Sequence, residues 1–283
     1  MSASALLLPR RQSRPRLALV LLSLLLLGGS LVHLGLGARW IAPQTVLQAL
    51  LHYDPRNFDH RIIVDLRLVR LAAALLTGAA LLFGGVMLLS SSGRGGVTPL
   101  RITLCGVALS AFASAVTAAI LILDEQTLLA MRTWLAGDLA GLNWQTLRAA
   151  LLPALAGVTI ALVIAPRLNV LALGDKVALG LGVKIVQTRL LGLTAIALLC
   201  GSAVAVAGPI GFVGLVVPHA VRRLISEDIR LALPLAAPVG ALVLLLADIA
   251  ARTLVAPQEL ATGAMTALVG APVFIFIAAR FFK

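Results

Sequence analysis

The sequence predicts an all-α fold: a polytopic bundle of transmembrane helices, with residues 1–283 forming a single integral membrane domain. The 283 residues are 60% apolar and only 12% charged, and the mean hydropathy is +1.06. Globular chains are about 45–50% apolar and about 25% charged. Apolar runs of about 20 residues recur along the chain, long enough for a helix to cross a bilayer core of about 30 Å. Because unpaired backbone groups are not tolerated in lipid, these runs must be helices.

The first expected helix, residues 17–37, follows four arginines between residues 10 and 16. A signal peptide is the alternative, but its apolar core is usually about 7–15 residues long and no A-x-A cleavage site follows here. A retained first helix is therefore favoured. Further long runs at residues 68–89, 102–123, 146–165, 190–207, 231–251 and 263–279, and a short run at 210–217, predict the remaining helices.

Residues 190–217 are too many for one crossing and too few for two complete ones. Gly208-Pro209-Ile210-Gly211 interrupts this stretch, and proline removes a backbone donor and fixes φ. A full helix, a turn and a short half-helix would return the chain to the side from which it came. We therefore expect seven long helices, each able to span the bilayer, plus one short half-helix. Together they make about eight crossings.

The basic residues predict the orientation of the bundle. If the chain starts inside and crosses at each run, fifteen of the 23 Lys and Arg residues lie inside and eight outside. Cytoplasmic loops of membrane proteins carry this excess. Both termini and residues 172–183 are therefore expected in the cytoplasm, and residues 39–61 and 124–144 outside. The net charge of +12 follows from the same rule, so nucleic acid is not an expected partner.

The sequence offers little for catalysis. It has no G-x-x-x-x-G-K-[ST] phosphate loop, H-E-x-x-H zinc helix or G-x-S-x-G elbow, and its four histidines are scattered. We expect no enzyme activity, catalytic residue, metal site or cofactor. Cys105 and Cys200 lie in apolar runs and are expected to act as small packing residues. Asp248 is the one carboxylate inside an apolar run, and Arg252 follows one helical turn later, so an ion pair is favoured over a proton relay.

Several polar segments occur in a distinctive order. Together they strongly resemble the FecCD family, the permease subunits of binding-protein-dependent ABC importers for iron-siderophores, haem and cobalamin. DLRLVR at residues 65–70 resembles the N-terminal motif of family members, although Val69 stands where the family has proline. The segments that carry the resemblance are WLAGDLAGLNW at 134–144, LNVLALGDKVALGLGV at 168–183, GPIGFVGLVVPH with AVRRL at 208–224, LLADIAAR at 245–252, and ELATG with TALVGAPVF between 259 and 274.

One departure from the family follows the second helix. There the family continues through a Gly-rich turn, an R-N-P-L-A segment and two more helices. Here residues 84–89 pass almost directly into residues 90–94, so about fifty residues are missing, enough for two crossings. Removing an even number of crossings preserves the downstream orientation. The chain could be a shortened working permease, an engineered or spliced product, or a degraded gene product.

The resemblance implies a permease of the bacterial inner membrane that receives work from a separate ATP-binding subunit and substrate from a periplasmic binding protein. A second copy of the chain would complete a homodimer. The residues that match the family's functional positions are Leu173, Gly174, Asp175, Ala178 and Gly182 for the ATPase-coupling loop; Pro218, His219 and Arg222 for a second cytoplasmic loop; Arg67, Arg70 and Arg252 for docking of the binding protein; and Gly106, Ser110, Ser114 and Thr117 as candidate lining of the pathway.

Each of these assignments has a plainer alternative. The coupling segment could be an ordinary interfacial helix, and the small residues of the third helix could serve simple packing. Arg67 and Arg70 could pair with Asp65 or lipid phosphate, and Arg252 with Asp248. Two rival functions also stay open: an ion-coupled secondary transporter, for which Asp248 is the only intramembrane carboxylate, and a transport-inactive scaffold. The sequence does not distinguish among siderophore, haem and cobalamin as substrate.

Overall fold

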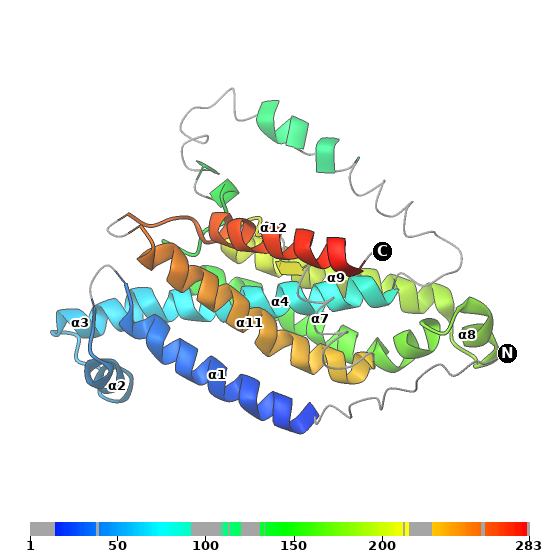
Figure 1. The fold of residues 1–283 in the computed structure, drawn as a ribbon, viewed down its shortest axis with the longest axis horizontal. Helices are drawn as coiled ribbons and strands as arrows, with labels where there is room; N and C mark the ends of the chain where they lie inside the picture. The colour runs from blue at the N-terminus through cyan, green and yellow to red at the C-terminus, as the bar shows by residue number, and fades with distance from the viewer. Residues whose placement is uncertain are drawn as a thin grey trace.

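The computed structural model describes residues 15–37, 40–91, 108, 110–112, 114–119, 131–132, 134–211, 213–214, 228–255 and 258–281. These residues form helices and connecting loops without any strand (Figure 1). The elements are α1 (Pro15–Gly35), α2 (Pro43–Leu51), α3 (Phe58–Arg61), the π-helix η1 (Ile62–Arg67), α4 (Leu68–Ser91), α7 (Trp144–Leu171), α8 (Asp175–Gly180), α9 (Ile185–Ala207), α11 (Ile229–Thr253) and α12 (Thr262–Phe281).

The long helices match the apolar runs of the sequence. Four of the described helices are long and apolar enough to cross a membrane: Leu17–Gly35, Trp144–Leu171, Ile185–Ala207 and Ile229–Thr253. Helix α4 coincides with the run at 68–89, and α12 with the run at 263–279. Residues 110–112 and 114–119, within the third run, are helical. The all-helical expectation is thus confirmed for the described residues.

The predicted interruption at Gly208 is present. Helix α9 ends at Ala207, and Gly208 has a φ of +70°, a left-handed conformation that glycine adopts without steric cost. The chain therefore leaves the helix sharply at the expected residue. Of the expected half-helix at 210–217, the structure describes residues 210–211 and 213–214.

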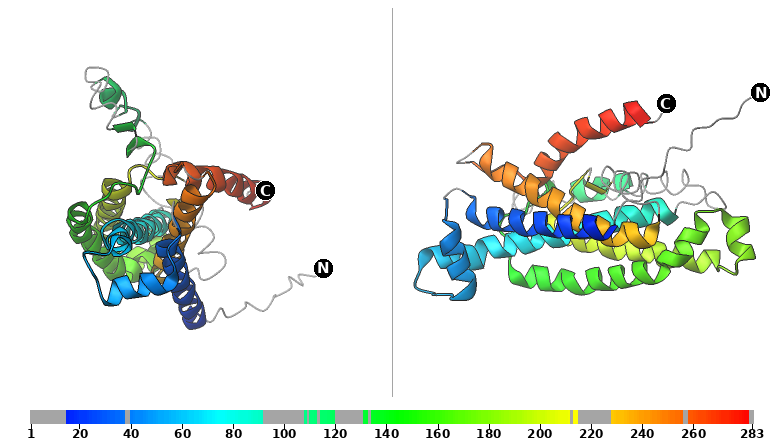
Figure 2. Two further views of the ribbon diagram at one scale, coloured as in Figure 1. Left: turned by 90° about the vertical axis from the view of Figure 1, so that its left-hand side faces the viewer. Right: turned by 60° about the horizontal axis from the view of Figure 1, so that its bottom comes forward.

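Helix α4 is the centre of the bundle and packs against α7, α9 and α11. Small residues allow close approach: a Cβ atom on Gly78 of α4 would collide with the carbonyl oxygen of Gly240 on α11. Ala73 and Ala74 are fully buried in the same core. Membrane helices associate through such small-residue contacts because lipid provides no hydrophobic driving force. Helix α12 packs against α11 and then diverges from the bundle (Figure 2).

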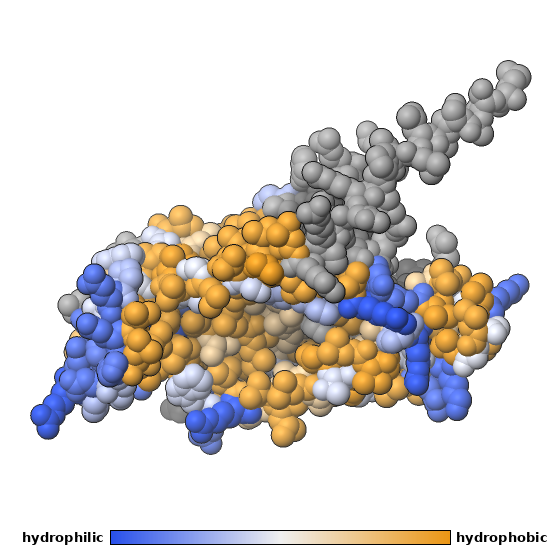
Figure 3. Space-filling model, turned by 90° about the horizontal axis from the view of Figure 1, so that it is seen from below, coloured by the Kyte–Doolittle hydropathy of each residue, from blue (hydrophilic) through white to orange (hydrophobic). Residues whose placement is uncertain are grey.

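The two ends of the bundle differ. Helices α2 and α3 lie at one end and α8 at the other; α1 runs toward the α2 end, and α12 runs away from it (Figure 1). Apolar side chains cover the middle of the face shown in Figure 3, and hydrophilic residues gather toward its ends. Leu152 is 77% exposed and Val163 is 64% exposed. Exposed apolar surface of this kind marks contact with a membrane or with another protein.

Candidate functional site

The carboxylate of Asp248 lies at the centre of a buried cluster near the α2 end of the bundle. Asp248 is fully buried. Its Oδ2 atom lies 2.8 Å from Nε2 of His33 and 3.1 Å from Nε of Arg252. Its Oδ1 atom accepts hydrogen bonds from Arg70 Nε at 3.1 Å and from Thr262 Oγ1 at 2.8 Å. A buried charge is tolerated when it is paired and hydrogen-bonded in this way.

The cluster joins the ends of four helices. His33 is in the last turn of α1, Arg70 in the first turn of α4, and Thr262 is the first residue of α12. Asp248 and Arg252 are one turn apart on α11, so they share a face. The expected ion pair between Asp248 and Arg252 is confirmed. Arg70 finds its partners in Asp248 and Glu259, where the sequence had suggested Asp65 or lipid phosphate.

Arg67 closes the C-terminus of α1. Its Nη1 atom donates to the carbonyl oxygens of Leu34 at 2.6 Å and Gly35 at 2.9 Å. These carbonyls have no partner within their own helix, and a cation is favoured at the negative end of the helix dipole. Burial lowers the pKa of Arg67 from its ordinary value, but a guanidinium stays charged at physiological pH. Gly37 lies so close that a Cβ atom there would be 2.9 Å from Nη2 of Arg67.

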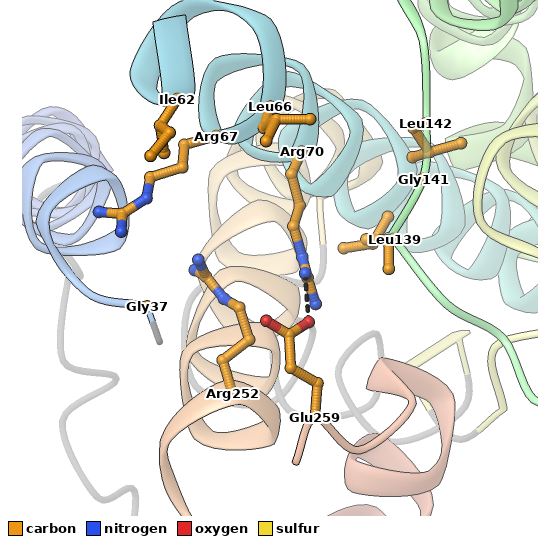
Figure 4. A pocket seen from close by; sticks show the side chains of 11 residues that line it. Gly37, Ile62, Leu66, Arg67, Arg70, Leu139, Gly141, Leu142, Arg252 and Glu259 are labelled. Carbon is orange, nitrogen blue, oxygen red and sulfur yellow. Dashed lines mark hydrogen bonds and ion pairs between the residues drawn. The ribbon is translucent and has the colours of Figure 1, made fainter. Parts of the chain in front are cut away.

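All three arginines expected to dock a binding protein line one cavity of about 350 Å³, together with Glu259. Figure 4 shows Arg70 pointing toward Glu259, while the guanidinium of Arg252 is turned away from Glu259 and Arg67 is turned toward Gly37. Glu259 Oε2 accepts from Arg70 Nη1 at 2.7 Å. Planar guanidinium groups bind carboxylates in defined geometry. The cavity is therefore chemically suited to receive a carboxylate.

The segment WLAGDLAGLNW forms one wall of this cavity. Leu139 is fully buried and lines the cavity, and Asp138 Oδ1 lies 3.9 Å from Nη2 of Arg70. The backbone N–H of Gly263 donates to the carbonyl oxygen of Gly137 at 2.7 Å. A Cβ atom on Gly208 would collide with the carbonyl oxygen of Trp134. Backbone contacts between these glycines thus fix the wall against α9 and α12.

The expected ATPase-coupling loop is a short helix between two turns. Gly174 precedes α8 with a φ of +108°, and Gly182 follows it with a φ of +75°. Ala178 is fully buried, whereas Leu173 is 68% exposed. Asp175 pairs with Arg189 of α9 at 3.0 Å. The loop therefore presents an apolar tip at the opposite end of the bundle from the arginine cavity (Figure 1).

The other residues expected to be functional belong to the third apolar run and to the second cytoplasmic loop. Pro218, His219, Arg222 and Gly106 lie outside the described residues. Ser110, Ser114 and Thr117 are on a helical segment, where the two serines are exposed and Thr117 is half-buried. Within the described ranges, no three His, Cys, Asp or Glu side chains are grouped in a way that could hold a metal ion.

Glu259, His33 and Thr262 were not predicted from the sequence as members of the site. His33 carried a usable signal, because a polar side chain in a spanning helix requires a partner and Asp248 was the only carboxylate in an apolar run. The sequence signal for Glu259 and Thr262 was weaker. Both belong to a segment that resembles the family, but their spacing does not reveal which helix ends they join.

Comparison with known proteins identifies the family. The model of the FecCD transport family matches residues 24–88 and 82–280. The two matched segments meet at residues 82–88, next to the place where family residues were expected to be missing. A solved structure of an inward-facing metal-chelate type ABC transporter has a TM-score of 0.80 and 28% sequence identity. That alignment covers 94% of this chain and all of the other.

Two curated relatives are permease proteins of iron import systems. The chain is 34% identical to the iron(3+)-hydroxamate import system permease protein FhuB of Bacillus subtilis (strain 168), over 89% of this chain and 80% of that protein. It is 41% identical to the ferric enterobactin transport system permease protein FepD of Escherichia coli (strain K12), over 74% of this chain and 61% of FepD. The chain belongs to the FecCD transport family of ABC importer permeases.

Proposed function

We propose that this chain is the permease subunit of an ABC importer that translocates a ferric siderophore or a related metal chelate across the bacterial inner membrane. The similarity to FhuB and FepD supports this class of substrate. Within the structure, the observation that carries the proposal is the pair of unlike surfaces at opposite ends of one apolar bundle. One is a cavity lined by three arginines, and the other is a short helix with an apolar tip.

The arginine cavity is the docking surface for a periplasmic substrate-binding protein. Arg67 and Arg70 lie at the junction of η1 and α4, Arg252 lies on α11, and all three line the same cavity. Acidic side chains of the partner would enter this cavity to reach the guanidinium groups, and charge complementarity of this kind sets orientation and association rate. Arg67 and Arg252 also bond to backbone carbonyl oxygens at the end of α1. A ligand bound to these arginines would therefore contact groups that are bonded to α1, α4 and α11.

The α8 loop is the contact for a separate ATP-binding subunit, which hydrolyses the ATP. Val177, Leu179 and Leu181 are each more than 45% exposed around the buried Ala178. An exposed apolar cluster on a short, glycine-bounded helix suits insertion into a cleft of another protein. Ion pairing of Asp175 with Arg189 would connect that contact to α9.

The orientation follows from the same two surfaces. The α8 end and both termini would be cytoplasmic, and the arginine cavity would face the periplasm. This agrees with the excess of basic residues assigned to the inside. Each crossing is a single helix about 10 Å across. About eight helices from one chain are too few to enclose a path wide enough for a large chelate, so a second copy would complete the pathway. The substrate pathway would then run between the copies, with Ser110, Ser114 and Thr117 as candidate lining.

Reconstitution in liposomes tests the function. The chain is combined with the ATP-binding subunit and the binding protein encoded by neighbouring reading frames, and uptake of radiolabelled ferric siderophore is measured. Uptake should require ATP and both partners. Docking of the binding protein should weaken as salt rises from about 50 to about 500 mM, because screening shortens the reach of charge interactions. Binding of siderophore to the binding protein alone is the control.

Other outcomes would contradict the proposal in distinct ways. Uptake driven by an ion gradient without ATP would indicate a secondary transporter. Partner assembly without uptake would indicate a scaffold, consistent with the missing residues. The surroundings of Asp248 disfavour an ion relay, because His33, Arg70, Arg252 and Thr262 already contact its two oxygens.

A further inference from the structure

Arg70 is held by two carboxylates of its own chain. Its Nε and Nη2 atoms both lie 3.1 Å from Oδ1 of Asp248, and its Nη1 atom lies 2.7 Å from Oε2 of Glu259. The Arg70 side chain is only 11% exposed. Nε and Nη1 of this guanidinium therefore already bond to carboxylates, whereas the buried Nη2 makes no hydrogen bond among the described residues.

The two partners of Arg70 differ in how easily they could be replaced. Asp248 is fully buried and also contacts His33, Arg252 and Thr262. The Glu259 side chain is 39% exposed, lies in the connection between α11 and α12, and lines the arginine cavity. A partly exposed ion pair contributes little to stability. Glu259 is therefore the partner that an external carboxylate could displace.

The other two docking arginines bond to backbone oxygens, and Arg252 in addition pairs with Asp248. Arg67 donates to the carbonyl oxygens of Leu34 and Gly35, and Arg252 donates to that of Leu36 at 3.1 Å. Backbone oxygens at the end of a helix cannot leave without unwinding it. Exchange of one carboxylate for another is consequently available at Nη1 of Arg70, where it needs only a side-chain rotation of Glu259.

We propose that Glu259 is an intramolecular competitor for docking: a carboxylate of the binding protein enters the arginine cavity and displaces Glu259 from Nη1 of Arg70. This inference rests on the proposed function. Replacing one carboxylate by another keeps Arg70 neutralised in both states, so docking gains only the difference between two similar interactions. Glu259 thereby keeps the affinity moderate and the binding protein able to leave, and it rejects anions that bind a guanidinium more weakly than a carboxylate does.

Displacement would also reach α12. Glu259 stands three residues before Thr262, which begins α12 and donates to Asp248 at 2.8 Å. The neighbouring Leu260 N–H donates to the carbonyl oxygen of Ala251 at 3.0 Å. Release of Glu259 would remove the side-chain contact between this connection and α4, while the bonds of Thr262 and Leu260 keep α12 attached to α11.

The test is the affinity of the transporter for its binding protein. Wild type, Glu259→Gln and Asp65→Asn transporters are assembled with the ATP-binding subunit in nanodiscs, and the dissociation constant of the neighbouring-frame binding protein is measured across salt concentrations. Glu259→Gln should tighten docking about two- to fivefold, the range expected for losing one weak competing ion pair, and should steepen its salt dependence. Asp65 is exposed on η1, outside the cavity. Asp65→Asn changes the net charge equally and should have little effect.

Two results would overturn the proposal. One is unchanged or weaker docking by Glu259→Gln in a transporter that assembles normally, which would make Glu259 neutral or part of the recognition surface. The other is equal tightening by Asp65→Asn, which would reduce the effect to net charge. Glu259→Asp is a second test variant. Its shorter side chain retains the charge but reaches Arg70 less well, so it should tighten docking by a smaller factor than Glu259→Gln does. If the wild-type transporter does not dock the binding protein, the proposed function itself fails.

Discussion

The carboxylate of Asp248 on α11 lies 2.8 Å from Nε2 of His33 on α1, although 215 positions separate the two residues. Both side chains are fully buried. Two arginines, Arg70 and Arg252, contact the same carboxylate. Asp248 therefore neutralises cations contributed by two helices and links them to a third. Stability and the geometry of the docking surface depend on the same buried group.

Replacement of Asp248 by Asn should destabilise the protein by about 3–5 kcal/mol, because removing one partner of a buried ion pair leaves uncompensated charge. The measurement is the free energy of unfolding in mixed micelles. Asp175→Asn provides the comparison, since its partner Arg189 is about one fifth exposed and such a pair contributes at most about 1 kcal/mol. An equal loss of unfolding free energy in both variants would show that the Asp248 cluster contributes no more to stability than an exposed ion pair.

Much of the fold was predictable because the bilayer restricts the choices. Apolar runs had to be helices, and the bounds of α4 and α11 fall within two residues of the predicted runs. Helix α7 was underestimated: its apolar run stops before Pro166, but the helix continues to Leu171 because Leu168 and Leu171 are fully buried. Helix α2 is not an apolar run at all. It is positioned by Val46 and Ala49, which pack into the smaller core near α1.

The site was predictable only in part. The pair Asp248–Arg252 follows from helical spacing, and the three arginines followed from the resemblance to the family. Their convergence on one cavity and the pairing of Arg70 with Glu259 did not, because contacts among α1, α4 and the α11–α12 connection depend on how the helices pack. Hydropathy describes which residues face lipid, but it does not specify which helix ends meet.

A second prediction concerns the wall of the arginine cavity. Gly263→Ala should destabilise the protein by about 1–3 kcal/mol, the usual cost of overpacking, because the added Cβ atom would collide with the carbonyl oxygen of Ala136. Gly28→Ala in α1 is the control, since a Cβ atom there has no neighbour within 4 Å among the described residues. Thermal unfolding in detergent should separate the two variants. A similar melting temperature for both would contradict the tight contact.

Topology gives a third prediction. In a background without Cys105 and Cys200, a cysteine at Lys176 in α8 should react with a membrane-impermeant maleimide only from the cytoplasmic side. A cysteine at Arg56 between α2 and α3 should react only from the periplasmic side. The two positions lie at opposite ends of the bundle (Figure 1), and the distribution of basic residues assigns the ends. Labelling of position 176 from outside would invert the proposed orientation.

The last prediction concerns the turn that ends α8. The N–H groups of Gly182 and Val183 donate to the carbonyl oxygens of Leu179 and Ala178 at 3.0 and 2.9 Å, the two bonds of a Schellman motif. Gly182 takes the left-handed position of this motif with a φ of +75°, and no atom would crowd a Cβ atom there. Position 182 therefore requires glycine because of its backbone conformation and not because a side chain would lack room. An L-residue in this conformation costs about 1–2 kcal/mol, and valine is particularly unfavourable because it is β-branched.

Gly182→Val should consequently disturb the α8 loop while leaving the distant bundle intact. In the reconstituted importer, ATP hydrolysis should continue but substrate uptake should fall, because the loop no longer holds its shape against the ATP-binding subunit. Gly180→Val is the matched control: Gly180 also has open space for a Cβ atom but lacks a positive φ. That variant should retain most of its uptake per ATP hydrolysed. If both variants transport normally, α8 is an ordinary interfacial helix and energy reaches the permease through another surface.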